Sequence, residues 1–256
     1  MIPETIAAFF HEYQDLLWLF TLTLDLSMTL LMYRLFGRLG LTAAIVLAIL
    51  LANLQGPKLT VIMGLETSLG VIFYSSIFFA TDLLGEKHGR AAASQAVLLG
   101  FGVSVIIVVM MSMSLLYLPS ARPESAQFSA EIHQAFSRIL DFTPRFVFGS
   151  LLAYLISQSF DVWFFHKVKT WTQDKHLWLR NNLSTITSQA LDTVLYAVIV
   201  WWGIFDLGTA LQLALAKYAF KVFIAAFDTP FIYWARNWEV PGTVGGGPVL
   251  PQRQQL

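Results

Sequence analysis

Apolar stretches long enough to cross a lipid bilayer recur along almost the whole 256-residue chain. A bilayer core requires about 20 residues of apolar helix per crossing. Seven stretches approach or exceed that length, at residues 16–36, 39–54, 67–84, 91–118, 143–165, 183–205 and 209–234. The charged fraction is 12%, whereas an average soluble domain has about 25%. The sequence therefore predicts an all-α integral membrane protein, with a bundle of six core transmembrane helices and one additional N-terminal helix.

Composition divides the chain into three parts. Residues 1–38 contain a short interfacial segment, with Ile6, Phe9 and Phe10 as apolar contacts, and the additional helix. Residues 39–238 form the predicted six-helix core. Residues 239–256 are rich in Gly and Pro and lack apolar periodicity, which predicts a flexible cytoplasmic tail. Inside the core, glycines between residues 56 and 70 indicate a loop that folds back toward the membrane, and residues 119–143 predict a short amphipathic surface helix.

The distribution of Lys and Arg predicts the orientation, because these residues favour the cytoplasmic side of short loops. With the N-terminus outside, ten of them fall in cytoplasmic segments and four in outside segments. No Lys or Arg precedes Arg34, so the first apolar run lacks the basic start of a secretory signal and is interpreted as a retained helix. We therefore expect a multi-pass membrane protein with its C-terminus in the cytoplasm, and the family resemblance described below implies that the membrane is a bacterial inner membrane. The ten cytoplasmic residues are Arg34, Arg38, Lys87, Arg90, Lys167, Lys169, Lys175, Arg180, Arg236 and Arg253, and the four outside are Lys58, Arg122, Arg138 and Arg145.

Several classes of function are disfavoured by what the chain lacks. Without cysteine it has no disulfide, thiolate metal site or cysteine nucleophile. Its formal net charge is +0 and no basic patch stands out, which argues against a nucleic-acid partner. No GxxxxGK[ST] motif is present, so the chain does not hydrolyse ATP through a P-loop. We expect no cofactor and no metal.

The most informative stretch is residues 181–203, where an apolar helix of spanning length carries an acidic residue. At 3.6 residues per turn, Thr185, Gln189, Asp192 and Tyr196 share one face, with Ser188 beside them. An ionisable side chain is costly in lipid and is expected to face protein or a wet cavity. This face predicts a polar site within the bundle.

Polar residues in three other spans point to the same interior. Asp82 and Glu86 are four residues apart and face the same side of a helix, and Asp82 lies deeper in the span. We expect Glu86 to form an ion pair with Lys87 or Arg90. Gln158 and Asp161 lie beside a small-residue seam of Gly149, Ala153 and Ser157 that brings another helix close.

Two cations in the last predicted span complete this set of polar residues. Lys217 and Lys221 lie one turn apart and, if buried, need carboxylate partners, for which Asp82, Asp161 and Asp192 are available. Each residue alone could form an ion pair or hydrogen bond that fixes helix register, as Asp25 could in the first span. The set on four helices favours a shared polar cavity, as transporters have near the bilayer midplane.

Four segments together resemble the queuosine precursor transporter family, also called vitamin-uptake-transporter-like. They are ATDLLGEKHGRAAA at 80–93, LAYLISQSFDVWFFHKVK at 152–169, LWLRNNLSTITSQALDT at 177–193 and KYAFKVFIAAFDTPFIY at 217–233. The resemblance implies import of a small deazapurine, 7-cyano-7-deazaguanine or its aminomethyl analogue, for tRNA modification. It also implies six core helices similar to the substrate-binding component of energy-coupling-factor transporters, with an energy-coupling module or a homo-oligomer left open. Residues at the family's polar positions are Asp82, Gln158, Asp161, Ser184, Thr185, Gln189, Asp192, Lys217 and Lys221.

We therefore interpret Asp82, Gln158, Asp161, Ser184, Gln189, Asp192, Lys217 and Lys221 as substrate-binding residues and assign no catalytic residue. Asp192 with Gln189 would accept and donate at the pyrimidine edge of the deazapurine, and Asp161 with Gln158 would complete the contacts. Three alternatives remain at this point: a transporter of another heterocyclic solute, an intramembrane enzyme that uses buried Asp residues, and a scaffold whose polar residues only pair with one another. The motifs of intramembrane proteases, such as Gly-x-Gly-Asp or His-Glu-x-x-His, do not occur.

Overall fold

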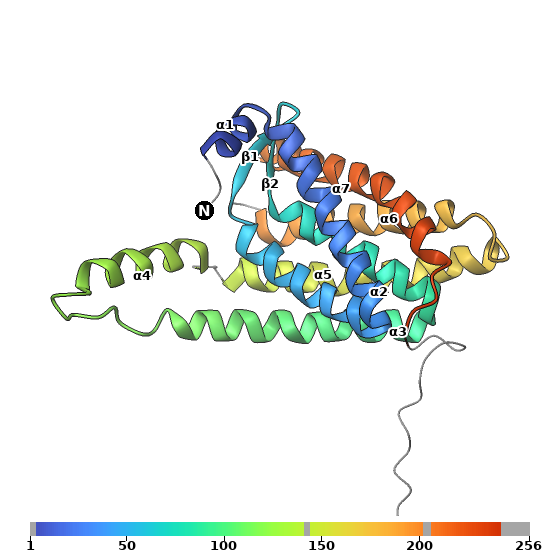
Figure 1. Cartoon of the computed structure of the whole chain (residues 1–256), viewed down its shortest axis with the longest axis horizontal. Helices are drawn as coiled ribbons and strands as arrows, with labels where there is room; N and C mark the ends of the chain where they lie inside the picture. The colour runs from blue at the N-terminus through green and yellow to red at the C-terminus, as the bar shows by residue number, and fades with distance from the viewer. Residues whose placement is uncertain (1–3, 141–143, 202–205, 242–256) are drawn as a thin grey trace, which may run out of the picture.

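Seven α-helices and one β-hairpin make up the described part of the computed structural model, which covers residues 4–140, 144–201 and 206–241. The long helices run roughly along one common direction (Figure 1). Most of the predicted tail, residues 242–256, lies outside the described residues. The helices are α1 (Glu4–Glu12), α2 (Gln14–Gln55), α3 (Gly70–Ser114), α4 (Ala126–Leu140), α5 (Pro144–Trp171), α6 (Leu177–Tyr196) with a π-helical extension η1 (Ala197–Trp201), and α7 (Leu207–Arg236).

The prediction of an all-α membrane protein is confirmed at the level of class. Among the described residues, four helices are long and apolar enough to cross a membrane: Gln14–Gln55, Gly70–Ser114, Val147–Trp171 and Leu177–Val200. Helices α2 and α3 are each interrupted by one glycine with a positive φ, Gly37 at φ 57° and Gly89 at φ 82°. Residues other than glycine rarely adopt such a backbone conformation inside a helix. Both interruptions fall where the sequence predicts a boundary between spans.

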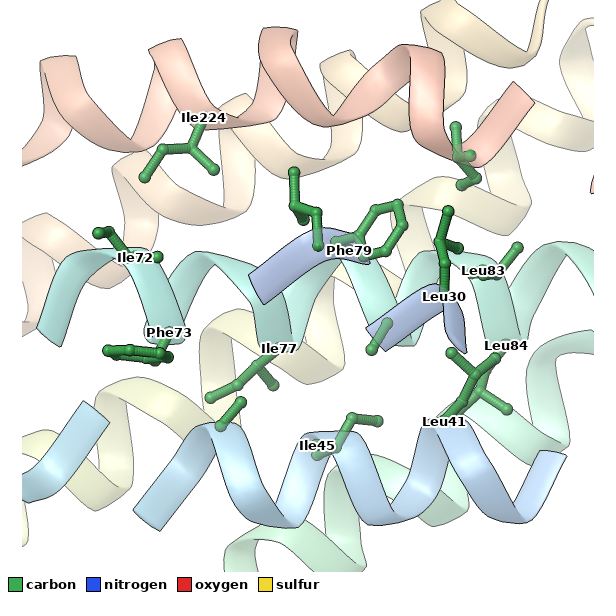
Figure 2. Packing of buried hydrophobic residues seen from close by; sticks show 14 of the residues in the cluster. Leu30, Leu41, Ile45, Ile72, Phe73, Ile77, Phe79, Leu83, Leu84 and Ile224 are labelled. Carbon is green, nitrogen blue, oxygen red and sulfur yellow. The ribbon is translucent and has the colours of Figure 1, made fainter. Parts of the chain in front are cut away.

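The first half of α3 forms the centre of the apolar packing. Figure 2 shows Ile72, Phe79 and Ile77 of α3 between α2 and α7. Ile72 and Phe79 are completely buried, and Ile77 is 1% exposed. Leu41 and Ile45 of α2 and Ile224 of α7 close around them. This packing fixes the positions of the polar residues that α3 also carries, Tyr74 and Asp82.

Helices α5 and α6 pack closely through the predicted small-residue seam. A Cβ added to Gly149 would lie 2.6 Å from Cγ2 of Val200, a separation that real structures do not show. Ala153 and Ser157, one and two turns further along α5, are buried at 1% and 0% exposure. The seam therefore lets the polar face of α6 lie directly against α5.

The link between residues 56 and 70 differs from the predicted loop. It forms an antiparallel hairpin of β1 (Leu59–Ile62) and β2 (Leu65–Ser68), in which Ile62 pairs with Leu65 across a two-residue turn. Met63 and Gly64 both have positive φ, at 51° and 76°, which is the geometry that a tight hairpin turn requires. Two segments outside the predicted spans form helices as expected: α1 in the N-terminal interfacial segment and α4 in the loop after α3. Helix α4 exposes Phe128, Ile132 and Phe136 and extends beyond the bundle (Figure 1).

Candidate functional site

A continuous polar stripe runs along the buried face of α6. The residues of the stripe are between 0% and 5% exposed, whereas Val194 on the opposite side of the helix is 60% exposed. From the first to the last of these residues the helix rises about 18 Å, more than half of the hydrocarbon thickness of a bilayer. The predicted polar face of the helix is thus confirmed, and it continues further toward the N-terminus of α6 than expected. The stripe consists of Arg180, Asn181, Ser184, Thr185, Ser188, Gln189 and Asp192.

A partly open cavity of about 500 Å³ adjoins one end of this stripe. Asn53 and Gly56 at the end of α2, Ser68 at the end of the hairpin and Arg138 of α4 line it, so it lies at the end of the bundle that carries these elements. Deeper residues of the lining are Tyr74, Tyr154, Asp192, Tyr196, Lys217 and Lys221. Three tyrosines, two lysines and one carboxylate therefore surround a space large enough for a small heterocyclic molecule.

Asp192 is the most heavily engaged residue of the cavity wall. Its Oδ2 accepts from Nζ of Lys221 at 2.6 Å, and its Oδ1 accepts from the Tyr74 hydroxyl at 2.5 Å and from Oγ of Ser157 at 3.2 Å. The Lys221 ammonium also lies 4.7 Å from the centroid of the Tyr74 ring. Helices α3, α5, α6 and α7 thus meet at one carboxylate, and its negative charge is compensated inside the bundle.

Lys217 lies one turn before Lys221 on the same wall of the cavity. Its Nζ is 5.2 Å from the centroid of the Tyr196 ring. Each of the two lysines therefore places its ammonium group near a tyrosine ring of the cavity wall.

Next to the cavity, α3, α5 and α6 enclose a second group of polar residues, which we call the buried polar cluster: Asp82, Gln158, Asp161, Thr185, Ser188 and Gln189. Thr185 donates to Asp82 at 3.0 Å, and Ser188 donates to Asp161 at 2.7 Å. Gln158 and Gln189 are completely buried, yet neither amide has a hydrogen-bond partner among the described residues. Such groups normally find partners when they are buried, so the cluster has unused capacity to bind a ligand.

Beyond the buried polar cluster, the stripe ends in a network of charges around Glu86. Arg180, which is completely buried, donates to both carboxylate oxygens of Glu86, at 2.6 and 3.1 Å. Lys169 and Arg236 approach the same carboxylate at 3.1 and 3.3 Å. The expected pairing of Glu86 with Lys87 or Arg90 is therefore wrong, because Lys87 instead donates to the backbone carbonyls of Arg236 and Trp238.

The structure distributes the predicted site residues over two adjacent places. Asp192, Lys217 and Lys221 line the cavity, whereas Asp82, Gln158, Asp161 and Gln189 belong to the buried polar cluster. Ser184 is buried on the stripe, where its hydroxyl donates to the carbonyl of Asn181 at 3.3 Å. Asp25 lies apart from both places and accepts from Ser76, so the simple interhelical hydrogen bond considered for it is confirmed.

Sequence reasoning missed the role of Arg180 and the contact of Ser157 with Asp192. Arg180 looks like an ordinary residue of a basic loop, because the sequence predicts the start of the helix six residues after its observed start at Leu177. The sequence pattern predicts only a packing role for Ser157, although its position on the seam also brings its hydroxyl to α6. In the described residues no group of three or more acidic or histidine side chains is arranged to hold a metal ion.

Comparison with known proteins adds evidence that is independent of this geometry. The family model described as "Putative vitamin uptake transporter" matches residues 68–235. The chain is 36% identical over 222 residues to the "Probable queuosine precursor transporter" of Bacillus subtilis (strain 168), covering 86% of this chain and 93% of that protein. It is 28% identical over 167 residues to the "Queuosine precursor transporter" of Escherichia coli (strain K12), covering 64% of this chain and 70% of that protein. No solved structure matches.

We predict that replacing Lys221 by Met lowers the thermal stability of the purified protein, because it leaves the Asp192 carboxylate buried without its cation. Removing one partner of a buried ion pair typically costs about 3–5 kcal/mol. The double replacement Asp192→Asn with Lys221→Met removes both charges and is expected to recover most of the loss. Thermal unfolding of wild type, Lys221→Met and the double variant in the same detergent gives the three midpoints to be compared. Equal midpoints for Lys221→Met and wild type would contradict the ion pair.

Proposed function

We propose that this chain, which belongs to the "Putative vitamin uptake transporter" family, imports a queuosine precursor into the cell. The observation that carries the proposal is the polar stripe of α6, which leads from a partly open cavity to two buried, unpartnered amides in an otherwise apolar bundle. The two named relatives support a queuosine precursor as the substrate. We infer that the substrate is a 7-deazaguanine, either the 7-cyano or the 7-aminomethyl compound.

For the membrane arrangement we propose seven crossings. The glycine interruptions divide α2 at residue 37 and α3 at residue 89, and α5, α6 with η1, and α7 supply the other three crossings. The N-terminus would lie outside and the C-terminus in the cytoplasm of a bacterium with the chain in its inner membrane. This orientation is supported by the excess of Lys and Arg at the end of the bundle near Gly37, Gly89 and Arg180. The cavity, which lies at the opposite end, then faces the outside.

Recognition of the substrate rests on two steps. The cavity offers the rings of Tyr74, Tyr154 and Tyr196, which suit stacking on a planar heterocycle. Gln158 and Gln189 then supply free amide groups, and Asp161 beside them supplies a carboxyl group that already accepts from Ser188. A guanine-type edge requires such groups, since it presents adjacent N–H donors and a carbonyl acceptor.

Asp192 connects these two steps. Its oxygens already accept from Lys221, Tyr74 and Ser157. A carboxylate offers about four acceptor sites, so a substrate edge with two adjacent N–H donors would displace at least one of these partners to bind it. We therefore assign Asp192, Lys221 and Tyr74 to the passage between the cavity and the buried polar cluster. The same displacement would allow release of the substrate when the three residues pair again.

The network around Glu86 would close the cytoplasmic end of the path. It joins α3, α5, α6 and α7 through Lys169, Arg180 and Arg236, and Glu86 is only 4% exposed at its side chain. Import requires alternating access, in which one end opens while the other closes around the site. The conformation described here corresponds to the state with the outside end open.

We predict that Asp192→Asn and Gln189→Leu each reduce uptake by about fivefold to a hundredfold in cells that cannot synthesise the precursor. Removing one buried hydrogen-bonding partner of a substrate typically costs about 1–3 kcal/mol, and 1.4 kcal/mol is a factor of ten. Queuosine in tRNA, measured at low external 7-cyano-7-deazaguanine, is the readout. The control is Thr187→Ala, because Thr187 lies on the outer side of the same helix and donates only to the carbonyl of Leu183. Normal uptake by Asp192→Asn, with the protein present in the membrane, would overturn the assignment.

Orientation can be tested directly because the natural chain has no cysteine. We expect a membrane-impermeant maleimide to label Lys58→Cys in intact spheroplasts and to label Lys175→Cys only after permeabilisation. Both lysines are exposed and lie at opposite ends of the proposed crossings. Labelling of Lys175→Cys in intact spheroplasts would contradict the arrangement, as would labelling of Lys58→Cys only after permeabilisation.

A further inference from the structure

We propose that a second pocket, between α3 and α5, binds the phosphate headgroup of an anionic phospholipid. This pocket has a volume of about 400 Å³ and is lined by Arg90, Trp163, His166, Lys167, Thr170 and Trp171. None of these residues lines the cavity or belongs to the buried polar cluster. The pocket lies at the end of the bundle where Gly89 interrupts α3, which is the end opposite the hairpin and α4.

The charges of the pocket have no internal compensation. Arg90 and Lys167 are both exposed, and neither forms an ion pair with a carboxylate in the described part of the chain. The nearby acidic residues Glu86 and Asp174 are already paired with Lys169 and Arg180. Two cations that share one pocket without a carboxylate attract an anion.

The aromatic residues of the pocket orient one of these cations and give the pocket an apolar side. Nζ of Lys167 lies 4.6 Å from the centroid of the Trp163 ring and 5.0 Å from that of Trp171. The two rings hold the ammonium at a defined place, but they leave its N–H donors available to an oxygen anion. Trp163 continues into an aromatic surface with Phe160 and Phe164.

These two properties together favour a lipid over a free phosphate ion. Trp residues with nearby Lys and Arg are typical of the membrane interface, where headgroup phosphates meet acyl chains. Basic pockets between transmembrane helices bind anionic headgroups in this way. The phosphate would lie against Arg90 and Lys167, and the acyl chains would follow Trp163, Phe160 and Phe164 into the membrane.

The test is lipid binding by the purified full-length protein, stripped of lipid in detergent and titrated with phosphatidylglycerol or phosphatidylcholine. Native mass spectrometry counts the bound lipid molecules. We expect one tight phosphatidylglycerol that phosphatidylcholine does not replace. Arg90→Gln and Lys167→Gln should each weaken its binding roughly fivefold, and together about twentyfold, as expected from the contribution of one cation near an anionic headgroup.

The matched control is the double replacement Lys58→Gln with Lys175→Gln, which removes the same charge from exposed positions outside the pocket. It should bind phosphatidylglycerol as wild type does. Equal binding by the pocket variant and the control variant would overturn the proposal. Displacement of the lipid by millimolar glycerol phosphate would also overturn it, since that result assigns the pocket to a soluble anion. Thermal unfolding without lipid shows that both variants are folded.

Discussion

The burial of charge in an apolar bundle is the constraint on which this structure depends. A carboxylate or an ammonium in the interior of a membrane protein costs several kcal/mol unless a partner compensates it. Asp192 with Lys221, and Glu86 with Arg180, meet that requirement at two levels of the same bundle. The first pair joins the successive helices α6 and α7, and the second joins α3 to α6 across 94 residues of sequence. The apolar packing around α3 and the polar contacts of α6 therefore specify one common arrangement.

The buried charges of Asp192 and Glu86 have cationic partners, but the buried polar cluster between these two residues contains polar groups without partners. Thr185 donates to one oxygen of Asp82, and Ser188 donates to one oxygen of Asp161. The side-chain amides of Gln158 and Gln189, however, remain without partners in the described residues. A scaffold whose polar residues only fix helix register has no reason to retain two such amides, because an apolar side chain of similar size would be less costly there. In the transporter proposed above, the substrate would supply the missing partners while it is bound. This difference is the physical reason to prefer transport over a structural role.

Much of this arrangement follows from the sequence, because helical periodicity places residues on faces. Thr185, Ser188, Gln189 and Asp192 were predicted to share the polar face of one helix, and the structure buries all four. The sequence also predicts span boundaries between residues 36 and 39 and between residues 84 and 91, where apolar runs end, and the structure places an interruption in each interval, at Gly37 and at Gly89.

Contacts between distant segments are harder to predict. The pairing of Glu86 with Lys169, Arg180 and Arg236 depends on the turn between α5 and α6, where Gln173, Asp174 and His176 have positive φ. The hairpin at residues 59–68 was missed because its alternation is short and its turn, Met63–Gly64, is not one of the usual pairs.

The central claim is that Gln158 and Gln189 are kept for a ligand. Binding of 7-cyano-7-deazaguanine to the purified protein tests it most directly, by calorimetry on wild type and on the double variant Gln158→Leu with Gln189→Leu. We expect saturable binding of one molecule by wild type, and no measurable binding by a variant whose thermal stability is equal or higher, because leucine removes two unpaired buried amides. Undiminished binding by the variant, or a large loss of its stability, would contradict the account and assign the two amides to the support of the fold.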